Sequence, residues 1–173
     1  WYEDFLATGE RWEKRGKRMD EQIDILKGLM NGEYFTYKGE FYDIPALKLC
    51  PAPTKPVPIL IGGHSKLALK RAARVGDGWI SAGLNLEDTK NLINQINVYR
   101  EEFGTLDHPN YQFQVMGEAA YTPEGILKLE ELGATEVIVA FRNTYEGGPD
   151  ERTLDGMIAE INWYAEEVIQ KSK

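Results

Sequence analysis

The sequence has very little cysteine and histidine, and these shortages restrict the chemistry that it can carry. Cys50 is the only cysteine among 173 residues, so no disulfide can form within the chain and no multi-cysteine metal site is possible. No set of His, Asp and Glu residues has the spacing of metal ligands, so no metal site is expected. This cysteine usage predicts a protein of the reducing cytoplasm.

Long apolar runs and an excess of positive charge are also missing. No apolar run approaches the roughly 18 residues that a membrane helix needs, and the first residues lack the basic and apolar regions of a signal peptide. The formal net charge is −8, which argues against nucleic acid or an anionic membrane as the main partner. We therefore expect a soluble protein that binds a small-molecule substrate and neither nucleic acid nor a membrane.

What is present is an ordinary globular composition with a repeating strand and helix pattern. Hydrophobic residues make up 42% of the chain, enough for one sizeable core, and we expect a single domain over residues 1–173. Strands are predicted at residues 57–61, 79–82, 111–121 and 136–141, each followed by a helical pattern. This alternation predicts an α/β fold with a parallel sheet and right-handed crossovers.

Before the first predicted strand, a helix is expected over residues 11–31, followed by an aromatic-rich insertion loop over residues 33–56 that forms a short hairpin or an irregular excursion. The strand at 57–61 is expected to be buried on both faces. Three helices carry apolar residues at spacings of three and four, which predicts stripes that face a core. These stripes are Met19, Ile23, Leu26 and Met30; Leu92, Ile96, Tyr99 and Phe103; and Met157, Ile161, Tyr164 and Val168.

The most informative stretch is the turn Gly62-Gly63-His64-Ser65, between the first predicted strand and its helix. Ser65 directly precedes the helix expected at 66–75 and is predicted to be its N-cap, as Thr122 is for a later helix. Glycines let a ligand oxygen approach the backbone, and a helix N-terminus carries partial positive charge, so the turn can cradle a phosphate. The alternative is that the glycines only connect the strand to the helix.

Two other glycine-containing motifs fit this turn poorly. A dinucleotide fingerprint needs G-x-G-x-x-G and an acidic residue at the tip of the next strand, which here ends in Ser81-Ala82-Gly83. A nucleophile elbow needs G-x-S-x-G, but Leu67 stands where the second glycine belongs. Ser65 is therefore interpreted as a helix cap and not as a nucleophile.

A few polar residues near predicted strand ends are further candidates, because loops after strands form the active face of such folds. Arg142 follows the last predicted strand and could bind a substrate or cofactor anion, and Glu118 is expected inside an apolar strand, where it either pairs with a neighbour or faces a pocket. His64 could donate to a phosphate or face water. Asp77 precedes a strand and is interpreted as a structural turn, and His108 is expected to lie far from any partner.

The stretch P-x-P-I-L-I-G-G-H-S, followed by A-L-K-R-A-A-R-x-G-D-G-W, resembles the C-terminal half of the bacterial luciferase-like monooxygenase family. The R-G-x-x-x-D-E pattern of residues 15–21 and Gly39-Glu40-Phe41-Tyr42 are also similar to that family. Its members are (β/α)8 TIM barrels that use FMN or the deazaflavin F420. A complete barrel needs about 250 residues, so this chain is expected to hold the C-terminal half, with about four parallel strands.

The resemblance implies that Gly62, Gly63, His64 and Ser65 hold the cofactor phosphate. It implies hydride transfer if the cofactor is F420, or monooxygenation of a small organic substrate if the cofactor is FMN. The G-G-H-S and D-G-W motifs favour F420. Catalytic side chains in the family come largely from the first barrel strands, so this chain alone is expected to be inactive and to need a missing N-terminal half-barrel or self-association. The alternative is a non-catalytic half-barrel module that binds a phosphorylated ligand or assembles with another chain.

Overall fold

The computed structural model describes residues 1–142 and 148–172. The chain forms two compact units, Trp1–Val57 and Pro58–Lys173, and each is described by itself. The expectation of a single domain stays a prediction. None of the helices among the described residues combines the length and apolar character that crossing a membrane requires.

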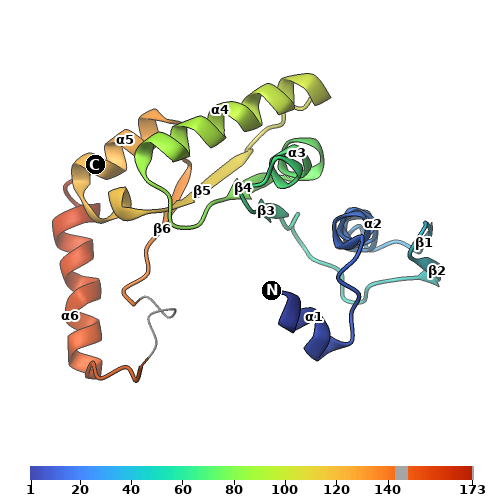
Figure 1. The fold of residues 1–173 in the computed structure, drawn as a ribbon, viewed down its shortest axis with the longest axis horizontal. Coiled ribbons are helices and arrows are strands. Elements are labelled where there is room, and N and C mark those ends of the chain that lie inside the picture. Colours follow the sequence, from blue (N-terminus) through green and yellow to red (C-terminus); the bar gives the residue numbers. More distant parts are fainter. Residues whose placement is uncertain (143–147, 173) are drawn as a thin grey trace. The chain divides into compact units, whose positions relative to one another are not determined.

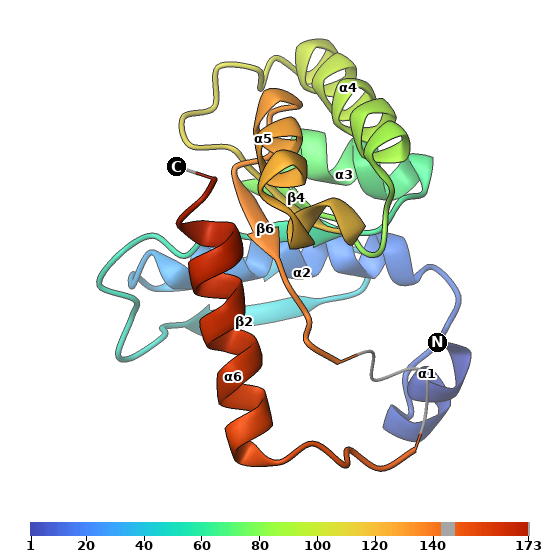
Figure 2. The ribbon, with the colours of Figure 1, turned by 90° about the vertical axis from the view of Figure 1, so that its left-hand side faces the viewer.

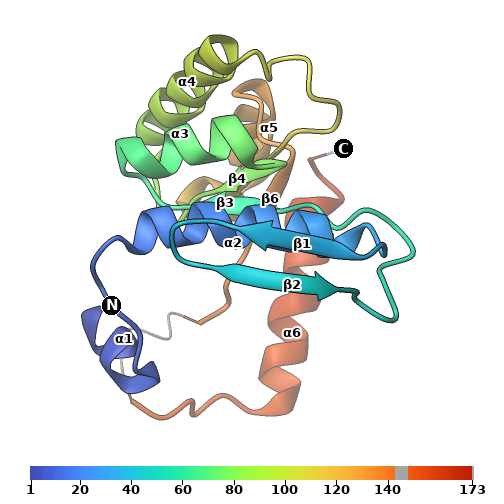
Figure 3. The same ribbon diagram turned by 90° about the vertical axis from the view of Figure 1, so that its right-hand side faces the viewer.

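Unit 1 consists of two helices and a hairpin (Figure 3). Its elements are α1 (Tyr2–Thr8), α2 (Arg15–Met30), β1 (Phe35–Lys38) and β2 (Asp43–Leu47), with β1 and β2 antiparallel. The helix expected at 11–31 is thus shorter, and the aromatic-rich stretch contains the hairpin that was one of its two predicted forms. The ring of Phe35 packs so closely on Gly28 of α2 that no Cβ fits there, which seats the hairpin along the helix.

The apolar stripe predicted for α2 is only partly buried. Ile23 is 4% exposed and Ile25 is 8% exposed, whereas Met19 is 46% exposed and Leu26 is 51% exposed. The prediction that Met19 and Leu26 face a core is therefore wrong in this structure. The physical reason is that a two-stranded hairpin is narrow and covers only one side of the helix.

Unit 2 contains four parallel strands in sequential order, β3-β4-β5-β6 (Figure 1). The strands are β3 (Leu60–Gly62), β4 (Gly78–Ile80), β5 (Gln112–Met116) and β6 (Glu136–Ile138). The helical elements are α3 (Lys66–Val75), α4 (Leu86–Phe103), η1 (Glu118–Tyr121), α5 (Pro123–Glu131), α6 (Leu154–Tyr164) and the π-helical turn η2 (Ala165–Ile169). The prediction of four parallel strands that alternate with helices is confirmed.

Helices α3, α4 and α5 lie together on one face of this sheet (Figure 2). Alternation along β5 separates the faces, because Phe113 and Val115 are buried while Gln112, Gln114 and Met116 are half-buried. Val115 packs in a core cluster with Ala120 and Leu129. The sheet therefore has one apolar, helix-covered face and a second face with polar side chains.

All four predicted strands are shorter than expected, and β4 and β6 end at Ile80 and Ile138, before the predicted ends at residues 82 and 141. Val57 is 52% exposed and lies outside β3, so the expectation of a strand buried on both faces over residues 57–61 is wrong. Among the described residues β3 pairs with β4 alone, which leaves its outer edge unpaired. The strand expected over residues 111–121 ends at Met116, because the chain turns into the 3-10 helix η1 at Glu118. Between the two elements only glycine fits at Gly117, since the Leu84 carbonyl lies where a Cβ would point.

The other two predicted stripes are also confirmed only in part. Ile96 and Tyr99 of α4 are buried, and so are Tyr164 and Val168 at the C-terminal end of the chain. Phe103 is 38% exposed and Ile161 is 55% exposed, so their expected burial is wrong in this structure. Phe103 lies at the C-terminal end of α4, where the ammonium of Lys70 on α3 lies over its ring, at 5.9 Å from the ring centroid. Ile161 lies on α6, which is not one of the helices that cover the sheet (Figure 1).

Candidate functional site

The glycine turn at residues 62–65 connects the carboxyl end of β3 to α3. Gly63 has φ of +103°, a conformation that favours glycine. Ser65 is the N-cap of α3, and its hydroxyl oxygen accepts the backbone N–H of Ala68 at 3.3 Å. The predicted cap is therefore confirmed, and the first turn of α3 points its N–H groups back toward the end of the strand.

Backbone donors are available in this turn. Among the described residues, no protein group accepts the N–H of Gly63, His64 or Ser65, and all three residues are exposed. The N-terminus of α3 adds partial positive charge at the same place. The turn thus combines backbone donors that have no protein acceptor among the described residues with a favourable dipole, two features that favour binding of an anion.

The next strand fixes the shape of the turn. The indole N–H of Trp79 donates to the carbonyl oxygen of Gly63 at 2.9 Å, and the Nε2 atom of His64 accepts the N–H of Ala82 at 3.3 Å. Because Nε2 is an acceptor, the neutral imidazole carries its proton on Nδ1. The His64 side chain is therefore oriented by the end of β4 and keeps one donor.

Glycine occurs at positions 62 and 63 for different structural reasons. A Cβ at Gly63 would lie 3.2 Å from the Cβ of Ala68 in addition to the unfavourable φ, so the backbone itself requires glycine there. A Cβ at Gly62 would meet the Cγ2 of Ile80 at 3.5 Å, an ordinary contact, and Gly62 is not among the glycines with positive φ. Neither packing nor backbone conformation explains Gly62, and its missing side chain leaves room for a ligand beside the turn.

A polar pair that the sequence reasoning missed lies in register with Gly62. The pairs Gly62↔Ile80, Ile80↔Gln114 and Gln114↔Glu136 form one row across the sheet. In this row Gln114 Nε2 donates to Glu136 Oε2 at 2.5 Å. The signal that could have found the pair is the alternation of glutamines with apolar residues in β5.

Glu118 and Arg142 differ from their predicted settings. Glu118 is not inside a strand, which corrects the prediction, because β5 ends early and Glu118 begins the 3-10 turn η1 with an exposed side chain. Arg142 follows β6 and donates from Nη2 to the Gly148 carbonyl oxygen at 2.8 Å, while its Nη1 lies 3.4 Å from Asp150. The structure brings neither residue into contact with the glycine turn among the described residues.

Asp77 lies at the opposite, amino end of the strands. Its Oδ2 accepts the backbone N–H of Ile59 at 2.8 Å, and its Oδ1 lies 3.3 Å from Nε2 of His108. Asp77 thus joins the starts of β3 and β4 to the loop before β5, which agrees with its interpretation as a structural turn. The expectation that His108 lies far from any partner is wrong, since a loop distant in sequence folds back onto Asp77.

In unit 1, the carboxylate of Glu21 holds the tip of the hairpin. Its oxygens accept the backbone N–H groups of Glu40, Phe41 and Tyr42 at distances of 2.7 to 3.1 Å. Gly39 is needed beside it, because a Cβ there would overlap the Glu21 carboxylate. The two upstream motifs noted in the sequence are therefore one structural unit.

Comparison with known proteins decides the family. Residues 3–123 match the model of the luciferase-like monooxygenase family. The chain belongs to this family. The resemblance stated from the sequence is thereby confirmed.

Curated relatives of this luciferase-like chain include an uncharacterized protein of Mycobacterium tuberculosis (strain H37Rv), 44% identical over 171 residues, or 99% of the chain and 58% of that relative. The FMNH(2)-dependent dimethylsulfone monooxygenase of Pseudomonas fluorescens is 34% identical over 96 residues, which cover 54% of the chain and 26% of the enzyme. The F420-dependent hydroxymycolic acid dehydrogenase of Mycobacterium tuberculosis is 30% identical over 99 residues, which cover 50% of the chain and 28% of the enzyme. The chain therefore spans 58% of the length of the relatives that match it from end to end.

Among solved structures, the coenzyme F420-dependent tetrahydromethanopterin reductase of Methanopyrus kandleri matches with a TM-score of 0.65. The match covers 88% of this chain and 63% of the reductase at 15% identity, so it speaks to the fold alone. The expected fold class is confirmed, namely an α/β chain with four parallel strands that matches part of the TIM-barrel luciferase-like structures.

Proposed function

We propose that this chain is the C-terminal part of a deazaflavin- or flavin-dependent oxidoreductase, and that the glycine turn at 62–65 holds the phosphate of the cofactor. The observation that carries the proposal is the set of exposed N–H groups of Gly63, His64 and Ser65 for which no acceptor exists among the described residues. Family membership supports it, since relatives are named as F420- and FMNH(2)-dependent enzymes.

In this proposal the residues of the chain bind and orient the cofactor, and the cofactor supplies the redox chemistry, hydride transfer for F420 or oxygen insertion for reduced FMN. The three backbone N–H groups donate to phosphate oxygens, and the proton on His64 Nδ1 is a further donor. Trp79 keeps the Gly63 peptide in place through its indole N–H. The residues present therefore fit a phosphate group.

F420 is the cofactor that we propose first, because the sequence of the glycine turn, Gly62-Gly63-His64-Ser65, resembles that of F420-dependent members of the family. FMN is the second candidate. Identity does not separate the two cofactors, because the FMNH(2)-dependent relative is 34% identical to the chain and the F420-dependent hydroxymycolic acid dehydrogenase is 30% identical. The substrate in either case is proposed to be a small organic molecule, oxidised or reduced by hydride transfer with F420 or oxygenated with FMN. The single cysteine supports a reducing, cytoplasmic setting.

The edges of the sheet support a further part of the proposal, that the chain acts together with an N-terminal half-barrel or a second copy of itself. Among the described residues β3 and β6 each pair on one side only. A barrel of this class needs eight strands, and the chain spans 58% of its relatives. Pairing at the two free edges would close the sheet and complete the active face.

The test is a titration with F420 and with FMN, monitored by fluorescence. It compares three forms of the chain: the parent, Gly62→Val and Ser65→Ala. Gly62→Val should weaken cofactor binding by about tenfold, equal to roughly 1.4 kcal/mol, while the unfolding midpoint stays close to that of the parent. Ser65→Ala is the matched control, because it removes a helix cap and costs about 1 kcal/mol of stability but leaves the N–H groups in place.

Unchanged cofactor affinity in a folded Gly62→Val protein would show that the turn is only a connector and would end the phosphate assignment. Tighter binding of FMN than of F420 would select the second cofactor. If the protein binds neither cofactor but does bind simple phosphate monoesters, the non-catalytic module is the better description.

A further inference from the structure

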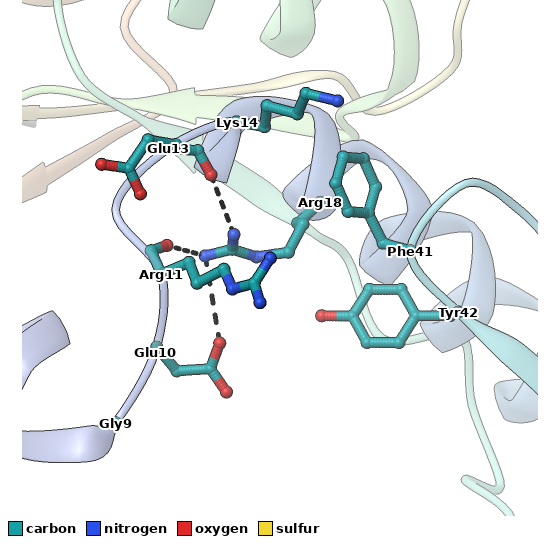
Figure 4. Close-up of a pocket in the computed structure, with 8 residues that line it drawn as sticks. All are labelled: Gly9, Glu10, Arg11, Glu13, Lys14, Arg18, Phe41 and Tyr42. Carbon is teal, nitrogen blue, oxygen red and sulfur yellow. Dashed lines mark hydrogen bonds and ion pairs between the residues drawn. The ribbon is translucent and has the colours of Figure 1, made fainter.

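Unit 1 contains a cavity of about 760 Å³ at the N-terminal end of α2. One wall is the loop after α1, from Gly9 to Lys14, and the other is formed by Phe41 and Tyr42 at the tip of the hairpin (Figure 4). We call it the loop–hairpin pocket. It lies wholly within unit 1 and does not involve the glycine turn of unit 2, so a ligand site there is independent of the proposed function.

Hydrogen bonds from side chains of α2 to the backbone hold both walls of the loop–hairpin pocket. The Arg18 side chain is only 12% exposed, and its guanidinium donates to the carbonyl oxygen of Glu13 at 2.9 Å and also to that of Arg11. The opposite wall is held by the Glu21 carboxylate, which accepts the N–H groups of Phe41 and Tyr42. The pocket is therefore preorganised, which lowers the entropic cost of binding a ligand.

Two polar groups in this pocket are free to take a ligand. The guanidinium of Arg11 extends into the pocket toward Tyr42 (Figure 4), and no carboxylate pairs with it among the described residues. The Tyr42 hydroxyl accepts a hydrogen bond from Gln22 Nε2 at 2.7 Å, so its own proton is available to a ligand. Lys14 differs, because its ammonium is already 2.6 Å from Glu40.

The lining charges and rings define the class of ligand. Lys14 is paired with Glu40, and the Arg18 guanidinium lies 3.9 Å from the Glu10 carboxylate. The Arg11 guanidinium is thus the cation of the lining that has no carboxylate partner among the described residues. A single negative charge balances it, whereas a phosphate dianion would meet the two glutamates of the lining, Glu10 and Glu13. The rings of Phe41 and Tyr42 offer an apolar surface to a flat body.

We infer that the loop–hairpin pocket binds a monoanionic aromatic carboxylate, with its carboxylate between Arg11 and the Tyr42 hydroxyl and its ring against Phe41. A guanidinium matches a carboxylate with two parallel N–H donors, and the tyrosine hydroxyl supplies a third. Such a ligand would use the two groups that the lining offers to an anion, the Arg11 guanidinium and the Tyr42 proton.

The experiment is an NMR titration of the protein with sodium benzoate, following the backbone amides of residues 9–18 and 39–42 and the Arg11 side-chain N–H. We expect saturable shifts confined to these residues, with a dissociation constant on the order of 1 mM. Arg11→Gln should weaken binding by about tenfold and Tyr42→Phe by about threefold. The Arg11 substitution preserves the pocket, because Arg18 binds the carbonyl oxygen of Arg11 and not its side chain.

The matched control is Lys17→Gln, which removes a cation near Glu40 that does not line the pocket. Its benzoate affinity should equal that of the parent. The inference is overturned if benzoate gives no saturable shifts up to about 10 mM, if Arg11→Gln binds as well as the parent, or if Lys17→Gln weakens binding as much as Arg11→Gln. Inorganic phosphate that binds as tightly as benzoate would also overturn it, since the lining is argued to prefer a monoanion with a ring.

Discussion

The indole N–H of Trp79 donates a hydrogen bond of 2.9 Å to the carbonyl oxygen of Gly63. Trp79 is completely buried, so its indole N–H would lose its partner without this bond, which is costly for a buried donor. It connects β4 to the one residue of the glycine turn that needs a left-handed backbone. The candidate anion site on β3 therefore depends on a side chain of the neighbouring strand.

Trp79→Phe should lower the free energy of unfolding by about 2 to 3 kcal/mol, because it removes this hydrogen bond and leaves a cavity. Urea unfolding followed by circular dichroism measures the change. Trp163→Phe is the control, since Trp163 is 52% exposed, and it should change stability by less than about 0.5 kcal/mol. Equal effects of the two substitutions would show that the Trp79 bond contributes nothing.

Local signals in the sequence were sufficient for the order of the elements and for their caps. Ser65 and Thr122 both cap helices as predicted, because an N-cap depends on residues only two or three positions away. The alternation of strands and helices likewise appears in the sequence itself. The polar residues of the candidate site were harder, because the Trp79 to Gly63 bond spans sixteen positions that no local pattern connects.

Strand ends and exposed stripes could not be predicted for a related reason. Just beyond the end of β5, the Leu84 carbonyl lies where a Cβ of residue 117 would point, a contact between residues far apart in the sequence that no local pattern reveals. The helical periodicity of Met19 and Ile161 is that of core residues, yet both side chains are exposed here, because burial depends on which elements surround a helix. Periodicity tells which side is apolar and not how much of that side is covered.

We expect the Glu21 carboxylate to make a measurable contribution to the stability of unit 1. Glu21→Ala should lower stability by about 3 kcal/mol, because three backbone N–H groups of the hairpin tip lose a charged acceptor, and Glu21→Gln should cost less. Chemical denaturation with amide exchange at residues 40–42 measures both the global and the local effect. Asp24→Ala, an exposed carboxylate on the same helix, is the control and should leave exchange at the hairpin tip unchanged.

We expect the buried Tyr111 side chain to cause a loss of stability at alkaline pH. Burial of its ring raises the pKa of Tyr111 to about 12, although the Arg100 guanidinium 3.9 Å from the ring opposes the rise. With an ordinary tyrosine pKa of 10.0, the unfolded chain loses this proton first, so stability should fall as the pH rises from 10 toward 12. The contribution lost is up to about 2 to 3 kcal/mol.

The measurement is the free energy of unfolding across that alkaline range for the parent and for Tyr111→Phe. The phenylalanine variant should show a smaller decline, and Tyr34→Phe, at a position that is 75% exposed, should decline as the parent does. A parent and a Tyr111→Phe variant with parallel curves would mean that Tyr111 titrates normally.

Substitution of Asp77 tests whether the amino end of the sheet serves stability alone, apart from the cofactor site proposed at the carboxyl end. Asp77→Ala should lower stability by about 2 kcal/mol, because the Ile59 N–H loses its acceptor and His108 loses its partner. Cofactor affinity of the folded fraction should stay unchanged, since Asp77 lies at the amino ends of β3 and β4 while residues 62–65 follow the carboxyl end of β3. Asp107→Ala, an exposed acid in the same loop as His108, should change neither quantity. Parallel thermal melts and cofactor titrations decide the matter: a loss of affinity in Asp77→Ala without a loss of stability would assign Asp77 to the binding site and remove it from the structural turn.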